Sequence, residues 1–199
     1  MKQLSIKASF KDKAVVVDII TKTFDSNPSV NSVIGATGNR RKKIQRLAEF
    51  AFIKALNKNG AYLSNNKKGA ALFYRADQNS FSLKEQFYEL RFALTSIPIK
   101  NIFKVLKREA YFKKIRPQDG KFYYFWFLGV LENGNNAGFE LKNCIFEKAN
   151  QDHLPIYLET SVYRNVTAYQ RFGFEIYHEW QDVENGHTVW FMKKNLFNA

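Results

Sequence analysis

Residues 157 to 174 hold polar side chains whose types and spacing could support chemistry. This segment reads YLETSVYRNVTAYQRFGF, which predicts a strand, a short break and a helix that ends at Gly173. The order brings Glu159, Ser161, Asn165 and Tyr169 to one strand-to-helix junction, a place where ligands commonly bind in α/β sheets. Glu159 could accept a proton or pair with a cation, and Tyr169 could donate a proton or simply pack in the core. Both alternatives stay open for each residue.

A second candidate is the polar loop that follows an aromatic run of strand length. Residues 133–138 read NGNNAG and precede a predicted helix. A glycine-containing loop before a helix can bind phosphate, because free backbone N–H groups and the positive end of the helix dipole converge there. Taken alone, such a loop is more often a plain connection, so the pattern is a weak signal for a phosphate site.

The elements that must position these segments alternate between helices and strands. Helical spacing of apolar residues predicts helices over 11–25, from residue 39 to about 58, after the polar loop, and over 162–172. The predicted strands are 121–130 and 156–161, with a hairpin over 61–75, a second hairpin around Asn185-Gly186 and a possible first strand at 5–8. This order predicts an α/β chain with one mixed sheet, as a single domain spanning residues 1–199.

Residues 79–120 form an insert of a different character. Two apolar stripes at helical spacing, on either side of Pro98, predict two amphipathic helices packed as a hairpin. The stripes consist of Leu83, Phe87, Leu90 and Leu94 in the first helix and Ile99, Ile102, Phe103, Leu106 and Ala110 in the second. The other faces are rich in lysine and arginine. We therefore expect a helical lid with a basic outer face.

Composition narrows the class of protein. Of the 199 residues, 45% are hydrophobic and 16% aromatic, which is typical of a packed globular chain. The single cysteine, Cys144, excludes an internal disulfide framework, and neither a signal peptide nor a segment of about 20 apolar residues is apparent. These features predict a cytoplasmic protein with no membrane association. The spacing of the three histidines predicts no metal site.

The formal net charge of +13 allows three interpretations. A basic chain can bind nucleic acid, but here the lysines and arginines are spread along the sequence without a recognised nucleic-acid-binding motif. A solvated basic surface is the simpler interpretation, and an anionic ligand such as a phosphorylated cofactor is the next. We therefore do not expect a nucleic-acid partner.

The two candidate segments together resemble the GCN5-related (GNAT) acyltransferases. The pattern LETS at 158–161, then Asn165, then AYQRFGF at 168–174 matches that family's last conserved segment nearly residue by residue. The run LGV at 128–130 and the loop after it resemble the end of the family's central strand and its acetyl-CoA pyrophosphate loop. The resemblance covers nearly the whole chain. It implies a mixed, mostly antiparallel sheet flanked by helices, with residues 79–120 as a two-helix insert between the third and fourth strands.

The match in the pyrophosphate loop is imperfect and allows two alignments. Without a gap, Gly138 takes the middle glycine and Glu140 falls where a small residue is expected. With the loop shortened by two residues, Gly134 and Gly138 are both retained and Asn136 replaces a glycine. We prefer the second alignment because Asn tolerates a left-handed backbone and an anionic Glu140 would repel a pyrophosphate.

The resemblance implies a role for each candidate residue in a transfer from acetyl-CoA. It implies that the cofactor contacts the residues of the central strand, the loop and the last motif, which are Leu128, Val130, Gly134, Asn135, Asn136, Ala137, Gly138 and Asn165. It also implies that Tyr169 protonates the departing thiolate, while Glu159 is a candidate base for the attacking amine. The implied acceptor is a small-molecule or peptide amine.

Two alternatives to this enzyme remain at the level of sequence. The imperfect match of the pyrophosphate loop is also consistent with a catalytically inactive relative that binds CoA or another anion. The basic insert fits a nucleic-acid-associated protein, and a homodimer is left open as well.

Overall fold

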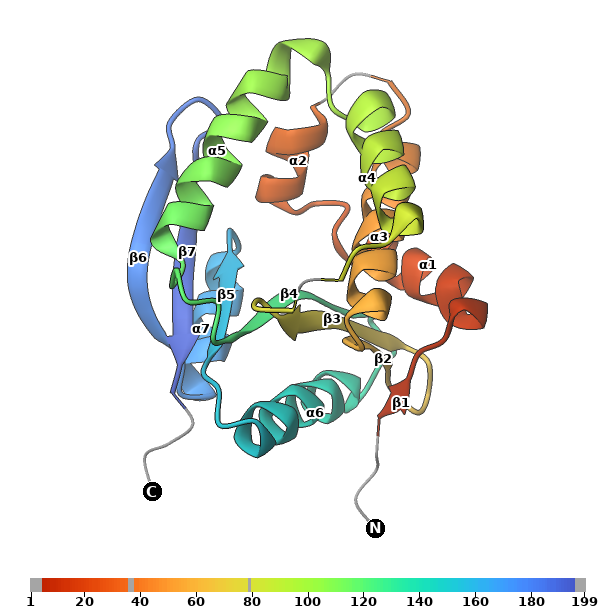
Figure 1. The fold of residues 1–199 in the computed structure, drawn as a ribbon, viewed down its shortest axis with the longest axis vertical. Helices are drawn as coiled ribbons and strands as arrows, with labels where there is room; N and C mark the ends of the chain where they lie inside the picture. The colour runs from red at the N-terminus through yellow and green to blue at the C-terminus, as the bar shows by residue number, and fades with distance from the viewer. Residues whose placement is uncertain (1–4, 36–37, 79, 196–199) are drawn as a thin grey trace.

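A central seven-stranded sheet organises the protein (Figure 1). The computed structural model describes residues 5–35, 38–78 and 80–195. The strand order is β1-β2-β3-β4-β5-β7-β6, and every neighbouring pair is antiparallel except β4 and β5. The strands are β1 (Ile6–Lys7), β2 (Ala61–Leu63), β3 (Gly69–Arg75), β4 (Tyr123–Val130), β5 (Ile156–Thr160), β6 (Glu175–Asp182) and β7 (His187–Lys194). The predicted mixed, mostly antiparallel sheet is therefore confirmed.

Helices cover both faces of the sheet and enclose a core on each side. On one face lie α1 (Lys13–Thr23) and α3 (Arg40–Asn57), whose buried apolar residues pack against β2, β3 and β4. The other face is covered by α6 (Ala137–Gln151) and α7 (Tyr163–Arg171), as Figure 1 shows. The contact between α1 and β4 is close, because a Cβ atom at Gly129 would lie 2.4 Å from Thr23 Oγ1. Gly129 thus fixes how tightly helix and sheet approach.

A short helix, α2 (Pro28–Ile34), follows α1 and was not predicted. The helix predicted over 11–25 ends just before Asn27-Pro28-Ser29, and these residues begin a helix of their own. Asn27 Oδ1 accepts a hydrogen bond from the Val30 amide at 3.1 Å, and Pro28 occupies the first helical turn. Asparagine before proline is favourable there, since the cap satisfies a free amide and proline lacks an N–H to lose.

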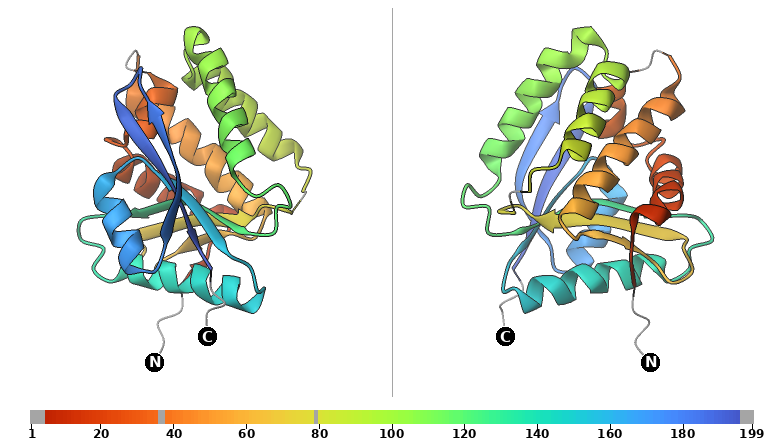
Figure 2. Two further views of the ribbon diagram at one scale, coloured as in Figure 1. Left: turned by 90° about the vertical axis from the view of Figure 1, so that its left-hand side faces the viewer. Right: turned by 45° about the vertical axis from the view of Figure 1, so that its right-hand side comes forward.

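The insert between β3 and β4 contains the two predicted helices, α4 (Leu83–Ser96) and α5 (Ile102–Ile115), joined through the 3-10 turn η2 (Ile99–Asn101). Their predicted arrangement is wrong in two respects. They diverge from η2 instead of packing together, so that α4 lies on α3 and α5 lies along the β6–β7 hairpin (Figures 1 and 2). Their outer faces also carry the apolar stripes, although a lid with a basic outer face was predicted.

Among the described residues, none of the helices combines the length and apolar character needed to cross a membrane.

Candidate functional site

Strands β4 and β5 separate from each other after only two paired positions. Their parallel pairing is limited to Tyr123 with Ile156 and Tyr124 with Tyr157. A bulge in β4 follows at once, because Phe125 and Phe127 oppose consecutive residues of β3 and leave Trp126 without an opposite residue. Bulges bend and twist a strand, which explains why the rest of β4 leaves β5. The separation creates an open edge along β4 that a ligand can use.

The predicted strand contacts, Leu128 and Val130, both lie on this part of β4 beyond its pairing with β5. Val130 remains in register with Gly69 of β3 on the other side. A strand edge that lacks a neighbour presents backbone donors and acceptors in a row. The structure therefore places both residues where backbone groups can bind an extended molecule.

The loop after β4 leads directly into the N-terminus of α6. Gly134 is required by close packing, since a Cβ atom there would lie 2.5 Å from Val130 Cγ1 and 2.8 Å from the Leu131 carbonyl oxygen. The left-handed residue is Asn135, with φ of 48°, whereas Asn136 has φ of −80°. An asparagine does adopt the conformation that glycine favours, but it lies one residue earlier than the preferred alignment suggested.

Several amides of this loop are free to bind an anion. The Gly134 amide donates to the Leu131 carbonyl at 2.8 Å, and the Ala137 amide donates to the Gly134 carbonyl at 3.0 Å. Within the described part of the chain, the amides of Asn135, Asn136 and Gly138 donate to no backbone or side-chain acceptor. Gly134 and Ala137 therefore shape the loop, and the other three offer N–H groups at a helix N-terminus.

Glu140 does not point its carboxylate at these amides. Its Oε1 atom accepts a hydrogen bond from the Asn65 amide at 2.9 Å, in the turn between β2 and β3. The same turn supports the loop from the other side, because Asn66 Nδ2 donates to the Gly134 carbonyl at 3.0 Å. The ungapped alignment implied repulsion between the Glu140 carboxylate and a bound pyrophosphate. The hydrogen bond from the Asn65 amide reduces that repulsion, and no sequence pattern indicated this contact.

Asn165 and Tyr169 share one face of α7, four residues apart, as the helical spacing predicted. Both side chains are half-buried, and neither makes a side-chain hydrogen bond to another described residue. The Tyr169 ring packs edge-on against Phe174, with 5.4 Å between centroids, and burial raises the pKa of its phenol to about 12. Gly173, with φ of 82°, ends the helix. An amide and a protonated phenol therefore lie on one face of α7, the helix that follows β5.

Glu159 is held by two partners and is almost buried, with a side chain 7% exposed. Arg116 binds it through two hydrogen bonds, from Nε to Oε1 at 2.8 Å and from Nη2 to Oε2 at 3.0 Å. The Tyr124 hydroxyl donates to Oε2 as well and accepts from Arg116 Nη2 at 3.0 Å. Burial disfavours the charge of Arg116, but Tyr124 and Glu159 outweigh it and raise the pKa of the guanidinium. The three side chains join the C-terminal end of α5 to β4 and β5.

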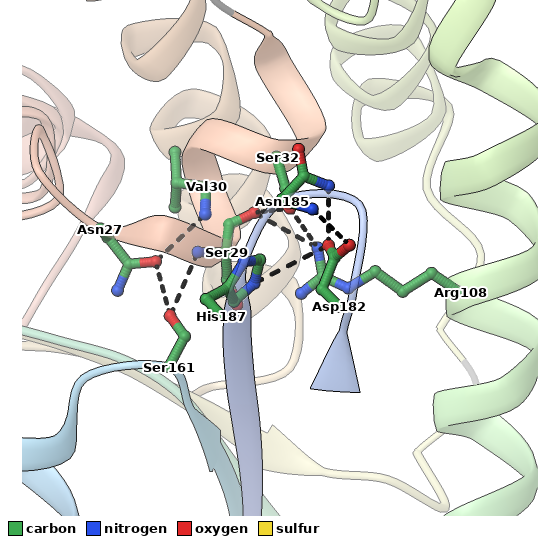
Figure 3. A network of polar contacts seen from close by, with 9 residues as sticks. All are labelled: Asn27, Ser29, Val30, Ser32, Arg108, Ser161, Asp182, Asn185 and His187. Atoms are coloured by element: carbon green, nitrogen blue, oxygen red, sulfur yellow. Dashed lines mark hydrogen bonds and ion pairs between the residues drawn. The ribbon is translucent and has the colours of Figure 1, made fainter. Parts of the chain in front are cut away.

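Ser161 connects the end of β5 to α2 (Figure 3). Its Oγ atom accepts a hydrogen bond from the Ser29 amide at 3.1 Å and lies 3.4 Å from Asn27 Oδ1. Arg108 of α5 reaches the same segment, since its Nη1 atom donates to the Ser29 carbonyl at 3.2 Å and to Ser32 Oγ at 3.3 Å. Sequence reasoning missed Arg108 because one basic residue among many in the insert gave no signal.

The tip of the β6–β7 hairpin completes this cluster with Asp182 and His187 (Figure 3). His187 Nε2 lies 3.9 Å from Asp182 Oδ2, and the Asn185 amide and side chain both donate to the Asp182 carboxylate. The His187 side chain is only 8% exposed. Burial lowers the pKa of this imidazole, and Asp182 opposes that effect only in part. His187 is therefore neutral in the folded protein near pH 7.

This burial predicts a pH-dependent stability. The folded-state pKa of His187 is depressed below its ordinary value of 6.5. Below about pH 6.5 the unfolded chain binds a proton that the folded protein does not, so the free energy of unfolding falls as the pH falls. We expect chemical denaturation at pH 7 and pH 5 to show a smaller loss for His187→Gln than for the unchanged protein. The exposed His153→Gln substitution is the matched control, and an equal loss in all three proteins would contradict the prediction.

The described residues offer no group of three histidine, cysteine, aspartate or glutamate side chains that could hold a metal ion. His178 interacts with an aromatic side chain, since its Nε2 atom lies 2.8 Å from the Tyr111 hydroxyl. Apart from the mutually paired Glu159 and Arg116, the polar groups of the candidate segments are amides, hydroxyls and a phenol. Such groups suit an uncharged or anionic organic ligand.

Comparison with known proteins identifies the fold. No protein-family model matches the chain, and no curated protein matches it significantly in sequence. Solved structures do match over nearly the whole length of both chains. An acetyltransferase from Corynebacterium glutamicum related to the histone acetyltransferase HPA2 superposes with a TM-score of 0.69 and 20% identity, covering 98% of this chain and 96% of its own.

Two insect enzymes superpose over similar lengths. Arylalkylamine N-acetyltransferase 2 from Aedes aegypti gives a TM-score of 0.62 at 16% identity, covering 96% of this chain and 98% of its own. The polyamine N-acetyltransferase of Drosophila melanogaster gives 0.67 at 9% identity, covering 96% and 99%. At these identities the likeness establishes the fold. The chain therefore has the fold of the GNAT acetyltransferases, as its sequence resemblance implied.

Proposed function

We propose that this protein is an acetyl-CoA-dependent N-acetyltransferase that acts on a primary amine in the cytoplasm. One observation carries the proposal: β4 and β5 separate between a loop with free amides and a helix that presents an amide and a phenol. Such an arrangement offers anion binding at one end of an extended cofactor and proton donation at the other. The solved structures that share the fold include arylalkylamine and polyamine N-acetyltransferases, which supports an amine as the acceptor.

The residues fit the parts of acetyl-CoA in order along the open edge of β4. The amides of Asn135, Asn136 and Gly138 would bind the pyrophosphate, with Gly134 and Ala137 holding the loop in shape. The backbone of Leu128 and Val130 would bind the pantetheine arm from one side. Asn165 would bind it from the other, because its amide is not engaged by any described residue. A donor near Val130 would also stabilise the developing negative charge on the thioester oxygen.

Tyr169 would supply the proton that the reaction needs at sulfur. The amine nitrogen attacks the thioester carbonyl, a C–N bond forms and the C–S bond breaks with its electron pair on sulfur. The Tyr169 hydroxyl then donates its proton to that thiolate. With a pKa of about 12, the phenol stays protonated at about pH 10.4, the ordinary pKa of an alkyl amine, where about half of the amine is already neutral. The proton that the amine loses leaves through water.

Glu159 was predicted either to accept that proton or to pair with a cation, and its contacts favour the second role. Both carboxylate oxygens are already bound by Arg116, and one is bound by Tyr124 as well. A general base must reach the proton that it accepts, and these three hydrogen bonds leave only about one of the four acceptor positions of the carboxylate open. We therefore assign Glu159 to hold α5 against the sheet.

Thermal unfolding with added ligand is the direct test of cofactor binding. Because acetyl-CoA binds only the folded state, 100 times its Kd should raise the free energy of unfolding by about 2.7 kcal/mol and raise the Tm. Pantetheine, which lacks the pyrophosphate, should give a clearly smaller shift. An absent shift with acetyl-CoA at millimolar concentration would refute the proposal. A shift without thiol release across a panel of amines would instead support the degenerate relative that binds CoA without catalysis.

A further inference from the structure

The outer faces of α4 and α5 are apolar, and no described residue covers them. Eight large side chains in this region are between 58% and 86% exposed. They are Phe81, Leu83, Phe87, Leu90, Leu94, Ile99, Phe103 and Leu106. Scattered exposed apolar residues are common on protein surfaces, but these follow one stripe along each helix. A run of this kind marks a surface that contacts another molecule.

Helix α4 packs on α3 with the opposite, more polar face. Arg91 Nη1 bonds Glu49 Oε2 at 3.0 Å, and Glu85 accepts from Asn57 Nδ2 at 3.2 Å. Between these contacts, Phe92 is buried and stacks on Phe50 with 6.2 Å between ring centroids. The contacting residues and the leucine stripe therefore lie about half a helical turn apart. The fold holds α4 in place without using its main apolar stripe.

The same arrangement holds in α5. Phe112 is buried against Phe191, at 4.8 Å between centroids, and Arg108 is held by α2. Phe103 and Leu106 lie on the other side of the helix and are exposed. Figure 2 shows α4 and α5 as the outermost elements on one side of the molecule, with α3 and the sheet behind them. Each helix thus turns its exposed stripe away from the elements on which it packs.

Exposed lysines border the apolar stripes and outnumber the exposed acidic side chains there. Exposed lysines in this region are Lys84, Lys100, Lys104, Lys107, Lys113 and Lys114. Only Glu89 and Glu109 are exposed acids along α4, η2 and α5, all of whose residues are described. Lys104 pairs with Glu184 and Lys84 lies over the Phe10 ring, whereas the other four lysines form no ion pair with a described residue. The surface is therefore apolar in its centre and positively charged around it.

We propose that α4 and α5 dock the protein on an anionic phospholipid surface. Helices with Phe and Leu on one face and lysine around it lie in the membrane interface, with the apolar residues inserted and the lysines at the headgroups. Such binding needs no segment that spans the bilayer, and it would replace the prediction from the sequence that the protein has no membrane association. A second copy of this chain fits less well, because two surfaces with unpaired lysines in a protein of formal net charge +13 would repel each other. The inference is independent of the proposed reaction, since none of these residues belongs to the candidate site.

Vesicle sedimentation with the whole 199-residue chain tests the proposal. We expect binding to vesicles of phosphatidylcholine mixed with phosphatidylserine, little binding to phosphatidylcholine alone, and a decrease as salt is raised. Lys107→Gln and Lys114→Gln should each lower the partition constant about fivefold. Phe103→Ser should lower it about tenfold, since it removes an inserted ring. Val183→Ser is the matched control, because Phe103 and Val183 are 83% and 84% exposed but only Phe103 lies on the proposed surface.

Two results would overturn the proposal. Equal binding to neutral and anionic vesicles, or none to either, would show that anionic lipid is not the partner. A dimer seen by light scattering that Phe103→Ser converts to monomer, without vesicle binding, would assign the surface to a second copy. Because these substitutions lie on exposed positions, thermal unfolding should be unchanged in each variant, which excludes misfolding as the cause.

Discussion

Substitution of Tyr169 by phenylalanine is expected to lower kcat about 10²–10⁴-fold while the Kd for acetyl-CoA changes little. The change removes only the hydroxyl, and the ring keeps its edge-on contact with Phe174. Because the hydroxyl bonds to no described residue, the free energy of unfolding should be nearly unchanged. Steady-state kinetics with a reactive amine and acetyl-CoA titration by calorimetry would measure the two effects separately.

Tyr163 provides the control on the same helix. It is 70% exposed and lies at the start of α7, so Tyr163→Phe removes a phenol of the same chemistry from the helix but not from the candidate site. We expect its kcat to equal that of the unchanged protein. If both variants kept full activity, Tyr169 would not be the acid. If acetyl-CoA failed to bind either of them, the fault would lie with the proposed function and not with the role of Tyr169.

The pH dependence should separate Tyr169 from other groups. Burial raises the pKa of its phenol to about 12, so its deprotonation cannot limit kcat below about pH 11. The activity should therefore rise with pH as the amine loses its proton, and it should stay high through the alkaline range. This profile follows from the sign of the shift: a raised pKa keeps the acid in its protonated form.

Much of this site could be predicted because its parts are local in sequence. The interval from Asn165 to Tyr169 is one helical turn, and Gly173 ends that helix with a left-handed backbone as its position suggested. The strand, loop and helix around Gly134 are local in the same way. For these segments, apolar periodicity and turn residues determine the structure that forms.

The parts that sequence did not predict depend on contacts between distant segments. The separation of β4 from β5 comes from a bulge at Trp126. Nothing in the aromatic run around Trp126 marks this residue as the one that bulges. Arg116 and Glu159 are bonded although they lie 43 positions apart in the sequence, and Arg108 and Ser29 are bonded although they lie 79 positions apart. The amphipathic pattern of the insert predicted its helices correctly but not their orientation. A periodic stripe indicates only that a face is apolar, and it cannot tell a protein core from an external partner.

The second large effect is expected at the buried pair of Arg116 and Glu159. Glu159→Ala leaves the guanidinium without its carboxylate in a site where the Arg116 side chain is only 19% exposed. Removing one partner of a buried ion pair lowers the free energy of unfolding by about 3–5 kcal/mol, because the remaining charge is neither hydrated nor compensated. Urea unfolding should show this loss in the free energy of unfolding. Asp77→Ala is the control, since its pair with Arg75 is about one-third exposed and should contribute less than about 1 kcal/mol.

A triple substitution distinguishes a structural role of Glu159 from a catalytic one. Arg116→Met, Tyr124→Phe and Glu159→Leu together remove every polar partner of the cluster and replace it with apolar groups of similar volume. Such replacements are often neutral for stability, so the triple variant should recover most of the stability that Glu159→Ala loses. If Glu159 only holds α5 against the sheet, kcat should recover as well, to within about tenfold. A stable triple variant that stays inactive would show instead that at least one of these three side chains takes part in the reaction, which would contradict a purely structural role for the cluster.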